Sequence, residues 1–157
     1  MILWNLGEQD PKNQLVKTLE TPAHKLNKDL LLNGFQINPA APSEVLICPR
    51  ARSAYLVSLD TSQVLLDYTT NSQSKEEELL AACFSSDARH VYALSTMKNL
   101  YIFEKHTGKL VSMLLVPTTK AATEVGNMLV QRVQDVGETM VIQNVNEIFK
   151  LDSKVVQ

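Results

Sequence analysis

One sequence pattern recurs along the chain at a nearly fixed interval, and it limits the possible folds more than any other feature. Short apolar strands followed by a polar turn occur at residues 2–6, 55–59, 100–104 and 147–151. With Trp4, Val57, Phe103 and Phe149 taken as equivalent, the successive separations are 53, 46 and 46 residues. Repeats of about 40 to 50 residues are typical of proteins built from one small β-sheet per repeat. The sequence therefore predicts a repeated supersecondary unit.

The clearest repeat spans residues 78–116 and contains four predicted strands, lettered a to d in chain order. Strands a and b are predicted at residues 79–84 and 90–95, with a Ser- and Asp-containing turn between them. Strands c and d are predicted at residues 100–104 and 109–116, and Gly108 suits a positive φ in the turn before strand d. Four strands joined by short turns predict one antiparallel blade of a β-propeller.

A short helix is the alternative at the start of this repeat, because the residues from Lys75 to Glu78 are good helix formers. A helix from Lys75 would extend for only about ten residues before the Ser-Ser-Asp turn. The strand is therefore favoured.

Complete and partial copies of the same unit cover the rest of the chain, so we expect an all-β fold made of β-propeller blades. In the preceding repeat, strands a to d are predicted at 31–37, 44–48, 54–59 and 63–68. At the N-terminal end, strands c and d are predicted at 1–6 and 14–19. At the C-terminal end, strands a to c are predicted at 128–133, 139–143 and 147–151, with a turn at 135–137 between a and b. The expected units are a partial blade over 1–20, blades over 21–70 and 71–117, and a C-terminal partial blade over 118–157.

The predicted ring is incomplete, because about two full and two partial blades are fewer than the four to eight of closed propellers. Open strand edges favour association with other chains. We therefore expect another chain or a further segment to complete the propeller.

Composition indicates an ordinary globular chain. Of 157 residues, 45% are hydrophobic and 20% charged, and the net charge of −2 gives no basis for sequence-independent nucleic-acid binding. Any RNA contact is expected to be indirect. No apolar run approaches the roughly 20 residues of a membrane span, so no membrane partner is expected.

Cys48 and Cys83 lie in apolar strands without CxxC spacing, which favours buried free thiols over a disulfide or metal site.

Residues 82–94, 101–103 and 107–110 resemble a WD repeat. In that pattern an apolar pair precedes a Ser/Pro-Asp-Gly-type turn, and an aromatic-acidic pair, here Phe103-Glu104, closes strand c. Trp4-Asn5 occupies the corresponding place in the first unit. The Gly-His pair of the family is absent, so we expect its His-Asp hydrogen-bond network to be missing and packing alone to hold the blades together.

The chain also resembles the C-terminal part of the Smu-type WD-repeat splicing factor. The matching residues are Asn38-Pro39, 44–48 with Arg50, 82–85, Val91-Tyr92, Leu100-Tyr101, 107–110 and 148–151. This resemblance implies a nuclear, non-catalytic scaffold of a pre-mRNA splicing assembly, with splicing factors such as RED as partners. The helical LisH-like region to which the family's RED contacts are mainly attributed is absent from this sequence. The alternative is a WD-repeat adaptor outside splicing, nuclear or cytoplasmic, for ubiquitin-ligase substrate recruitment or trafficking.

Strand alternation predicts where a partner would bind. In an antiparallel blade, the b–c and d–a connections share one face of the disc, and the a–b and c–d turns share the other. Charged loops on the first face are usually only solvated, but they are also where propellers bind partners. The candidate partner-binding residues are Arg50, Arg52, Lys75, Glu76, Lys98 and Asn99, accompanied by 118–123.

No pattern in the sequence indicates an enzyme, a cofactor or a metal site. His24, His90 and His106 lack a carboxylate or cysteine at ligand spacing, and the glycines are too dispersed for a phosphate loop. The three acids 76–78 more plausibly form a solvated edge or contact a basic partner than act as a catalytic pair. An aromatic RNA-stacking platform is also considered, but the strand spacing favours core packing of Tyr55, Tyr92, Tyr101, Phe103 and Phe149.

Overall fold

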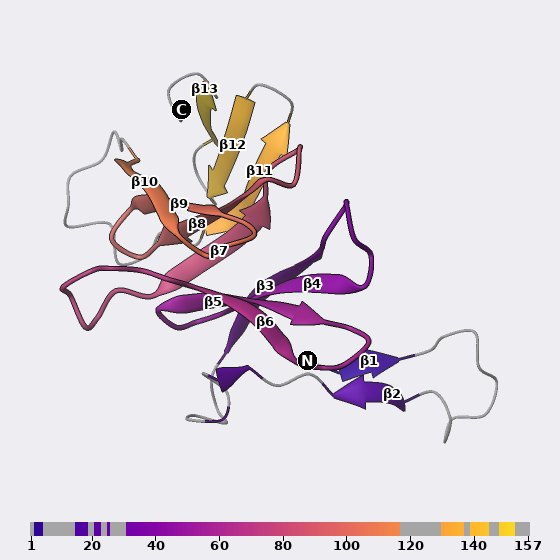
Figure 1. The fold of residues 1–157 in the computed structure, drawn as a ribbon. Helices are drawn as coiled ribbons and strands as arrows, with labels where there is room; N and C mark the ends of the chain where they lie inside the picture. The colour runs from indigo at the N-terminus through magenta and orange to yellow at the C-terminus, as the bar shows by residue number, and fades with distance from the viewer. Residues whose placement is uncertain are drawn as a thin grey trace.

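The computed structural model is a series of antiparallel β-sheets that follow one another along the chain (Figure 1). It describes the backbone of residues 2–4, 15–18, 21–22, 25, 31–116, 130–136, 139–144 and 148–152, and the side-chain surroundings of residues 21, 22, 25 and 31–116. Alternating apolar residues and short turns dictate this architecture, because each sheet must bury one face against the next.

Two complete four-stranded sheets form the centre of the described structure, in the orders β3-β4-β5-β6 and β10-β9-β8-β7. Every predicted strand of these two blades is confirmed to within one residue at each end. The strands of the first sheet are β3 (Leu32–Ile37), β4 (Glu44–Pro49), β5 (Ser53–Ser58) and β6 (Val64–Thr69). Those of the second are β7 (Leu79–Phe84), β8 (His90–Ser95), β9 (Asn99–Glu104) and β10 (Leu110–Leu115).

Two smaller sheets flank this pair. β1 (Ile2–Trp4) pairs with β2 (Leu15–Thr18), as the predicted strands c and d require. The strands β11 (Val130–Val136), β12 (Thr139–Asn144) and β13 (Ile148–Asp152) form a three-stranded sheet in sequence order. The predicted turn at 135–137 begins too early, because Asp135 and Val136 still pair with Met140 and Thr139. A fourth strand at 154–157 lies outside the described residues.

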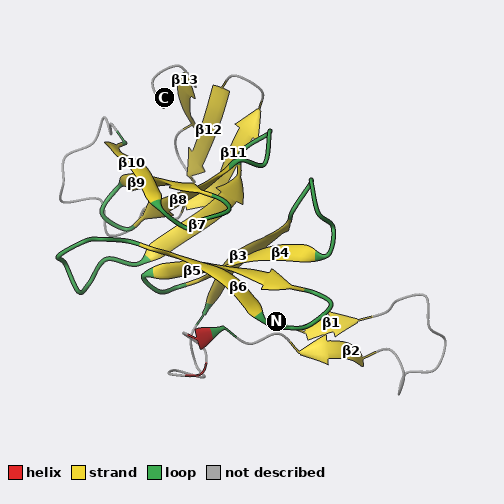
Figure 2. Ribbon diagram, in the orientation of Figure 1, coloured by secondary structure: helices red, strands yellow, loops and turns green. Residues whose placement is uncertain are grey.

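The helical alternative at Lys75 is wrong. Lys75 and Glu76 lie in a turn, and strand β7 begins at Leu79 (Figure 2). Helical backbone occurs at Pro22 and Lys25, where the Lys25 N–H donates to the Thr21 carbonyl at 3.1 Å. In the part of the chain that the structure describes, no helix has the length and apolar character to cross a membrane.

The main core is an apolar layer between the two complete sheets, called the inter-blade layer below. Every strand of the two sheets except β3 contributes residues to it, and most of these alternate along the strand, as period-2 side-chain geometry requires. The first sheet supplies Leu46, Cys48, Ala54, Leu56, Leu66 and Tyr68, and the second supplies Leu79, Ala82, Phe84, Val91, Ala93, Tyr101, Phe103 and Leu110. The remaining faces carry their own clusters, so both sheets are apolar on both sides.

Polar contacts fix how the second sheet sits on the first. The Asn33 side chain donates to the Leu79 carbonyl at 2.7 Å, and the Gln36 side chain accepts from the Phe84 N–H at 2.8 Å. Both contacts join β7, the innermost strand of its blade, to β3, the innermost strand of the blade before it. The two inner strands therefore lie together, as strands around a propeller axis do.

The opposite margin of the layer is held from the turn between β9 and β10. The buried Tyr68 hydroxyl donates to the Lys105 carbonyl at 2.7 Å, and the Lys105 ammonium lies 3.2 Å from the Glu44 carboxylate. Gly108 has φ +68°, and a Cβ there would lie 2.8 Å from the Asp67 carbonyl oxygen. The left-handed conformation predicted for Gly108 is confirmed, and close packing on β6 is a second reason for glycine.

The expected cysteine and aromatic environments are confirmed where they are described. Cys48 and Cys83 are buried and form no disulfide, and burial raises the pKa of the Cys48 thiol to about 12. Tyr55, Tyr92, Tyr101 and Phe103 are buried in the apolar clusters, which rules out an exposed stacking platform for these four. The side-chain surroundings of Phe149 lie outside the described residues.

The two inner strands differ in what covers them. Phe35 and Ile37 of β3 pair with Ile47 and Val45 of β4, and the corresponding pairs of the next blade join Ala82 to Ala93 and Phe84 to Val91. Phe84 is 3% exposed beneath the first sheet, whereas its counterpart Ile37 is 53% exposed and Phe35 is 60% exposed. On β7 this face is covered by the preceding blade. In the described part of the chain, the equivalent face of β3 is exposed.

A pair of substitutions measures this difference. Phe84→Ala is expected to lower the free energy of unfolding by about 3–5 kcal/mol, because it opens a cavity in the inter-blade layer. Phe35→Ala, on the exposed face of β3, is expected to cost less than about 1 kcal/mol. Urea unfolding followed by circular dichroism checks both values. Equal losses would show that β3 is covered in solution.

Candidate protein-interaction surface

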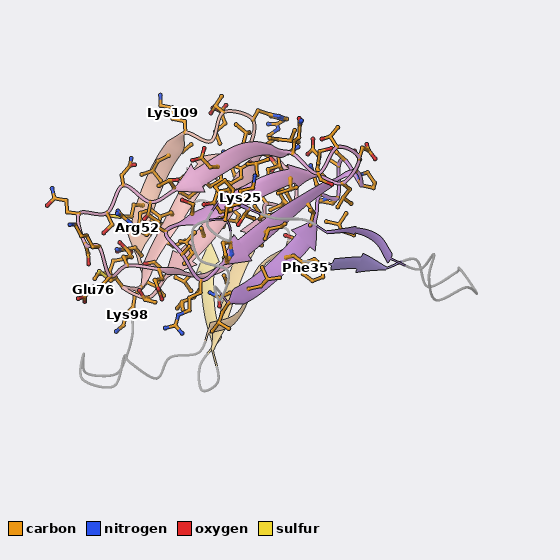
Figure 3. All side chains as sticks on the ribbon, turned by 90° about the horizontal axis from the view of Figure 1, so that it is seen from below. Lys25, Phe35, Arg52, Glu76, Lys98 and Lys109 are labelled. Atoms are coloured by element: carbon orange, nitrogen blue, oxygen red, sulfur yellow. The ribbon has the colours of Figure 1, made fainter. Side chains whose placement is uncertain are left out.

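The b–c and d–a connections of the two complete blades meet at one end of the sheets. We call this end the loop face; it comprises residues 50–52, 70–78 and 96–98. Backbone hydrogen bonds join the three segments, from the Leu79 N–H to the Ala51 carbonyl at 2.7 Å and from the Thr96 N–H to the Glu78 carbonyl at 2.8 Å. Figure 3 shows Arg52, Glu76 and Lys98 at this end and Lys109 at the other.

The candidate residues that the sequence assigns to one face do lie on the loop face or at its border. Arg50 forms an ion pair with Glu78 at 2.7 Å, and both side chains are partly exposed. Arg52 donates from Nη2 to the Ser72 carbonyl and thereby holds the d–a loop. Lys75 and Glu76 are exposed at the tip of that loop. The proposed companion segment 118–123 lies outside the described residues.

Lys98 and Asn99 stand where the b–c turn enters β9. Lys98 is half-buried with φ +64°, and its carbonyl accepts the Val116 N–H at 2.9 Å. The Asn99 amide is turned toward Glu77, to which it donates at 3.0 Å. Asn99 therefore contributes to the support of the loop face, while Lys75, Glu76 and Arg50 present charge on its surface.

Beneath the exposed loops, one buried carboxylate gathers polar side chains from three elements. Glu77 is fully buried and accepts hydrogen bonds from the hydroxyls of Ser95, at the end of β8, and Tyr101, in β9. Tyr101 Oη lies 3.0 and 2.9 Å from the two carboxylate oxygens. With Asn99, these residues make up the Glu77 network, which fastens the d–a loop to strands b and c of the second blade.

The hydrogen bonds decide the ionisation of this carboxylate. Burial alone raises the pKa of Glu77, but hydrogen bonds from Ser72, Ser95, Asn99 and Tyr101 outweigh it and hold the pKa below the ordinary glutamate value. Burial and the hydrogen bond to Glu77 raise the pKa of Tyr101. Glu77 is thus a charged acceptor among neutral donors, an arrangement stronger than neutral pairs provide.

Two expectations from the sequence are wrong here. Glu77 is not part of a solvated acidic edge, although its neighbours Glu76 and Glu78 are exposed or partly exposed. The second blade is also not held by packing alone, because the Glu77 network links the d–a loop to strands β8 and β9 by hydrogen bonds. The sequence does contain a feature that indicates such a network. Polar residues, Ser95 and Asn99, lie at the ends of strands b and c, beside an acidic loop.

In the part of the chain that is described, the remaining ionisable groups do not cluster into a metal-binding site. Among those residues, no three His, Cys, Asp or Glu side chains are placed to hold a metal ion. His90 is the half-buried first residue of β8 and His106 is exposed in the β9–β10 turn, while His24 lies outside the described residues.

The Glu77 network makes a pH-dependent contribution to stability. A folded-state pKa below the unfolded value stabilises the fold above the unfolded pKa, and this contribution is lost as the pH falls through the folded pKa. Glu77→Gln is expected to cost about 1–3 kcal/mol at pH 7, because the amide places an N–H group among donors. The difference from the parent chain is expected to shrink below about pH 4. Urea unfolding between pH 7 and 3 checks this.

The exposed neighbour supplies the control for that measurement. Glu76→Gln removes one carboxylate from the same loop without touching the network, so its unfolding free energy is expected to stay within about 0.5 kcal/mol of the parent chain. A loss at Glu76 equal to that at Glu77 would mean that loop charge, and not the buried network, is responsible.

Comparison with known proteins gives the fold a context. No family model matches the sequence. Among solved structures, the WD40 β-propeller domain of Doa1 is similar with a TM-score of 0.56 and 12% identity, covering 76% of this chain and 35% of that one. Raptor from Chaetomium thermophilum is similar with a TM-score of 0.67 and 11% identity, covering 91% of this chain and 13% of that one.

The chain therefore spans about a third of the length of the first structure and about an eighth of the second. At these identities the similarity shows the fold. The two four-stranded sheets and their order along the chain agree with it. The sheets that the structure describes have the fold of WD40-type β-propeller blades.

Proposed function

We propose that the chain is a non-catalytic scaffold of a pre-mRNA splicing assembly and that the loop face binds its protein partners. The observation that carries this proposal is the combination of exposed charge and rigid support at that face. Lys75, Glu76 and the Arg50–Glu78 pair are at the surface, while the Glu77 network holds the loop beneath them. A preorganised surface loses less conformational entropy when it binds.

The chemistry of the loop face suits a polar protein partner better than a small molecule. Arginine and lysine alternate with glutamate across it, and Met97 adds one apolar side chain that is 42% exposed. Mixed charge on a rim contributes mainly to orientation and association rate, and the apolar contact contributes affinity. This composition is that of a transient interface between folded proteins.

The splicing context and a nuclear location are supported by the resemblance of residues 44–48, 82–85 and 107–110 to the Smu-type splicing factor. Under this proposal the partners are splicing factors, RED among them, and contact with RNA is indirect. The alternative is an adaptor outside splicing, in ubiquitin-ligase substrate recruitment or trafficking, which would use the same loop face. Doa1 and Raptor share only the fold with this chain and do not decide between these contexts.

Affinity purification from nuclear extract tests the proposal. The parent chain is expected to recover spliceosomal snRNP proteins, and Lys75→Glu or Arg50→Ala to reduce that recovery about five-fold, as loss of about 1 kcal/mol at an exposed charged contact implies. Quantitative mass spectrometry of the bound proteins provides the readout. Recovery of cullin adaptors or coat subunits in place of snRNP proteins would refute the splicing context and support the alternative.

Arg89 provides the matched control, because it lies in the a–b turn of the second blade, at the end opposite the loop face, and its side chain is 80% exposed. Arg89→Glu and Arg89→Ala make the same charge changes away from the loop face. If they reduce snRNP recovery as much as the loop-face variants do, the partner does not bind at the loop face.

A further inference from the structure

The inner strand of the first blade has an apolar surface that the described sheets leave exposed. Phe35 and Ile37 of β3 are 60% and 53% exposed, and Figure 3 labels Phe35. Directly paired residues share a face of a sheet, so Ile47 and Val45 of β4 lie on the same face, and both are buried. The exposed surface is therefore confined to the innermost strand.

The equivalent surface of β7 is covered by the two inner strands of the first sheet. β7 contacts β3 and β4. Two amide side chains of β3 reach the edge of β7, where Asn33 donates to the Leu79 carbonyl and Gln36 accepts from the Phe84 N–H. The inner strand of one blade is thus joined to the inner strand before it by a pair of amides.

This amide pair occupies fixed register positions. In β3, β7 and β11 the second residue of the strand is unpaired at a bulge, and the other position lies three residues later. The bulged residues are Asn33, Leu80 and Gln131, and those three residues later are Gln36, Cys83 and Gln134. β11 therefore repeats the amide pair of β3 with glutamine at both positions, whereas β7 has leucine and cysteine.

We propose that the sheet β11–β12–β13 of one copy of this chain packs on β3 of a second copy, so that two copies form one ring. β3 is the first and β11 the last of the three inner strands in the described part of the chain. The contact is therefore head to tail. Gln131 and Gln134 of one copy take the roles of Asn33 and Gln36, and they bind the edge of β3 in the other copy.

The number of strands also favours a second copy as the occupant. Three inner strands from each of two copies make six, and closed propellers have four to eight blades. A head-to-tail contact that is repeated about a two-fold axis closes such a ring. β1 and β2 correspond to the outer strands c and d, so the inner place before β3 is left for strands a and b, which are β11 and β12 in the last sheet.

Arg132 is the residue of β11 that such a contact must accommodate. Its register position is that of Gly34 in β3, since the two pair with Gln143 and Cys48 one step after the bulge. A Cβ at Gly34 would meet nothing within 4 Å. This position opens onto free space, so a long side chain there does not obstruct the packing of one blade on the next.

Sedimentation velocity at chain concentrations from about 0.1 to 100 µM tests the proposal. The parent chain is expected to form a dimer. Phe35→Asp places a charge on the covered face and is expected to raise the dimer dissociation constant at least about ten-fold. Gln134→Leu removes one amide from β11 and is expected to raise it about five-fold. Leu65→Asp, at an exposed apolar position of the outer strand β6, is the matched control and is expected to stay within about two-fold of the parent value.

Cross-linking identifies the two surfaces that meet. A chain with Gln134→Cys is mixed with a chain with Ile37→Cys, and a bismaleimide is added. Cys48 and Cys83 are buried and do not react. A covalent heterodimer is expected, and replacing the Ile37→Cys chain by a Leu65→Cys chain is expected to abolish it.

Circular dichroism establishes that each variant is folded, and Ile37→Lys takes the place of Phe35→Asp if that variant is not. The small loss of stability expected for Phe35→Ala refers to the dissociated chain, measured below the dimer dissociation constant. Above that concentration, association adds stability that increases with the concentration of the chain.

A parent chain that stays monomeric over the whole range, or that forms species larger than a dimer, would overturn the proposal. A dimer that Phe35→Asp leaves intact, or that Leu65→Asp weakens equally, would do the same, as would equal cross-linking to the Leu65→Cys chain. Because β3 and the loop face are separate surfaces, none of these results affects the test of the loop face.

Discussion

The apolar layer between the two complete sheets is the interaction on which the rest of the described structure depends. Alternate residues of strands from both sheets meet in it, and Tyr68, Tyr101 and Phe103 fill its outer half with ring centroids 5.7 and 6.2 Å apart. Such burial is the main favourable term in folding. Apolar packing alone is not directional, however, so a second set of contacts must determine how one sheet is placed on the other.

Polar contacts at the margins supply that direction. Asn33 and Gln36 tie β3 to β7 at the inner side, and Tyr68 and Lys105 tie β6 to the β9–β10 turn at the outer side. A buried lysine costs desolvation energy unless it is paired, and Glu44 pairs Lys105 across the blade boundary. We interpret these contacts as specifying the alignment of the blades, while the apolar layer supplies most of the stability. The loop face follows from that alignment, because its segments come from both blades.

The strands were predictable because a 46-residue repeat, period-2 alternation and turn residues all point to the same answer. The boundaries of β7 and β8 match the prediction residue for residue. Which individual polar residues are buried could not be predicted in the same way. Glu76, Glu77 and Glu78 are identical in chemistry and adjacent in sequence, yet only Glu77 is fully buried. Its burial depends on Ser95 and Tyr101, which are brought to it by strand pairing over 18 and 24 residues of sequence. Sequence periodicity predicts where the strands lie along the chain. A hydrogen-bond network such as this one depends on which strand ends are close together in the folded structure.

A repeated fold contains its own comparisons, and these locate specialised surfaces better than composition does. Positions that are equivalent in two blades share backbone geometry, so a difference between them reflects what surrounds or binds them. Ile37 and Phe84 are equivalent and both apolar, but Phe84 is buried beneath the first sheet whereas Ile37 is exposed. Asp67 and Met113 are equivalent and both solvent-facing, yet one is charged and the other is not. In the first contrast the residue type is retained and the exposure differs, so it reflects packing between sheets. In the second contrast both positions are exposed, and it is the residue type that has changed.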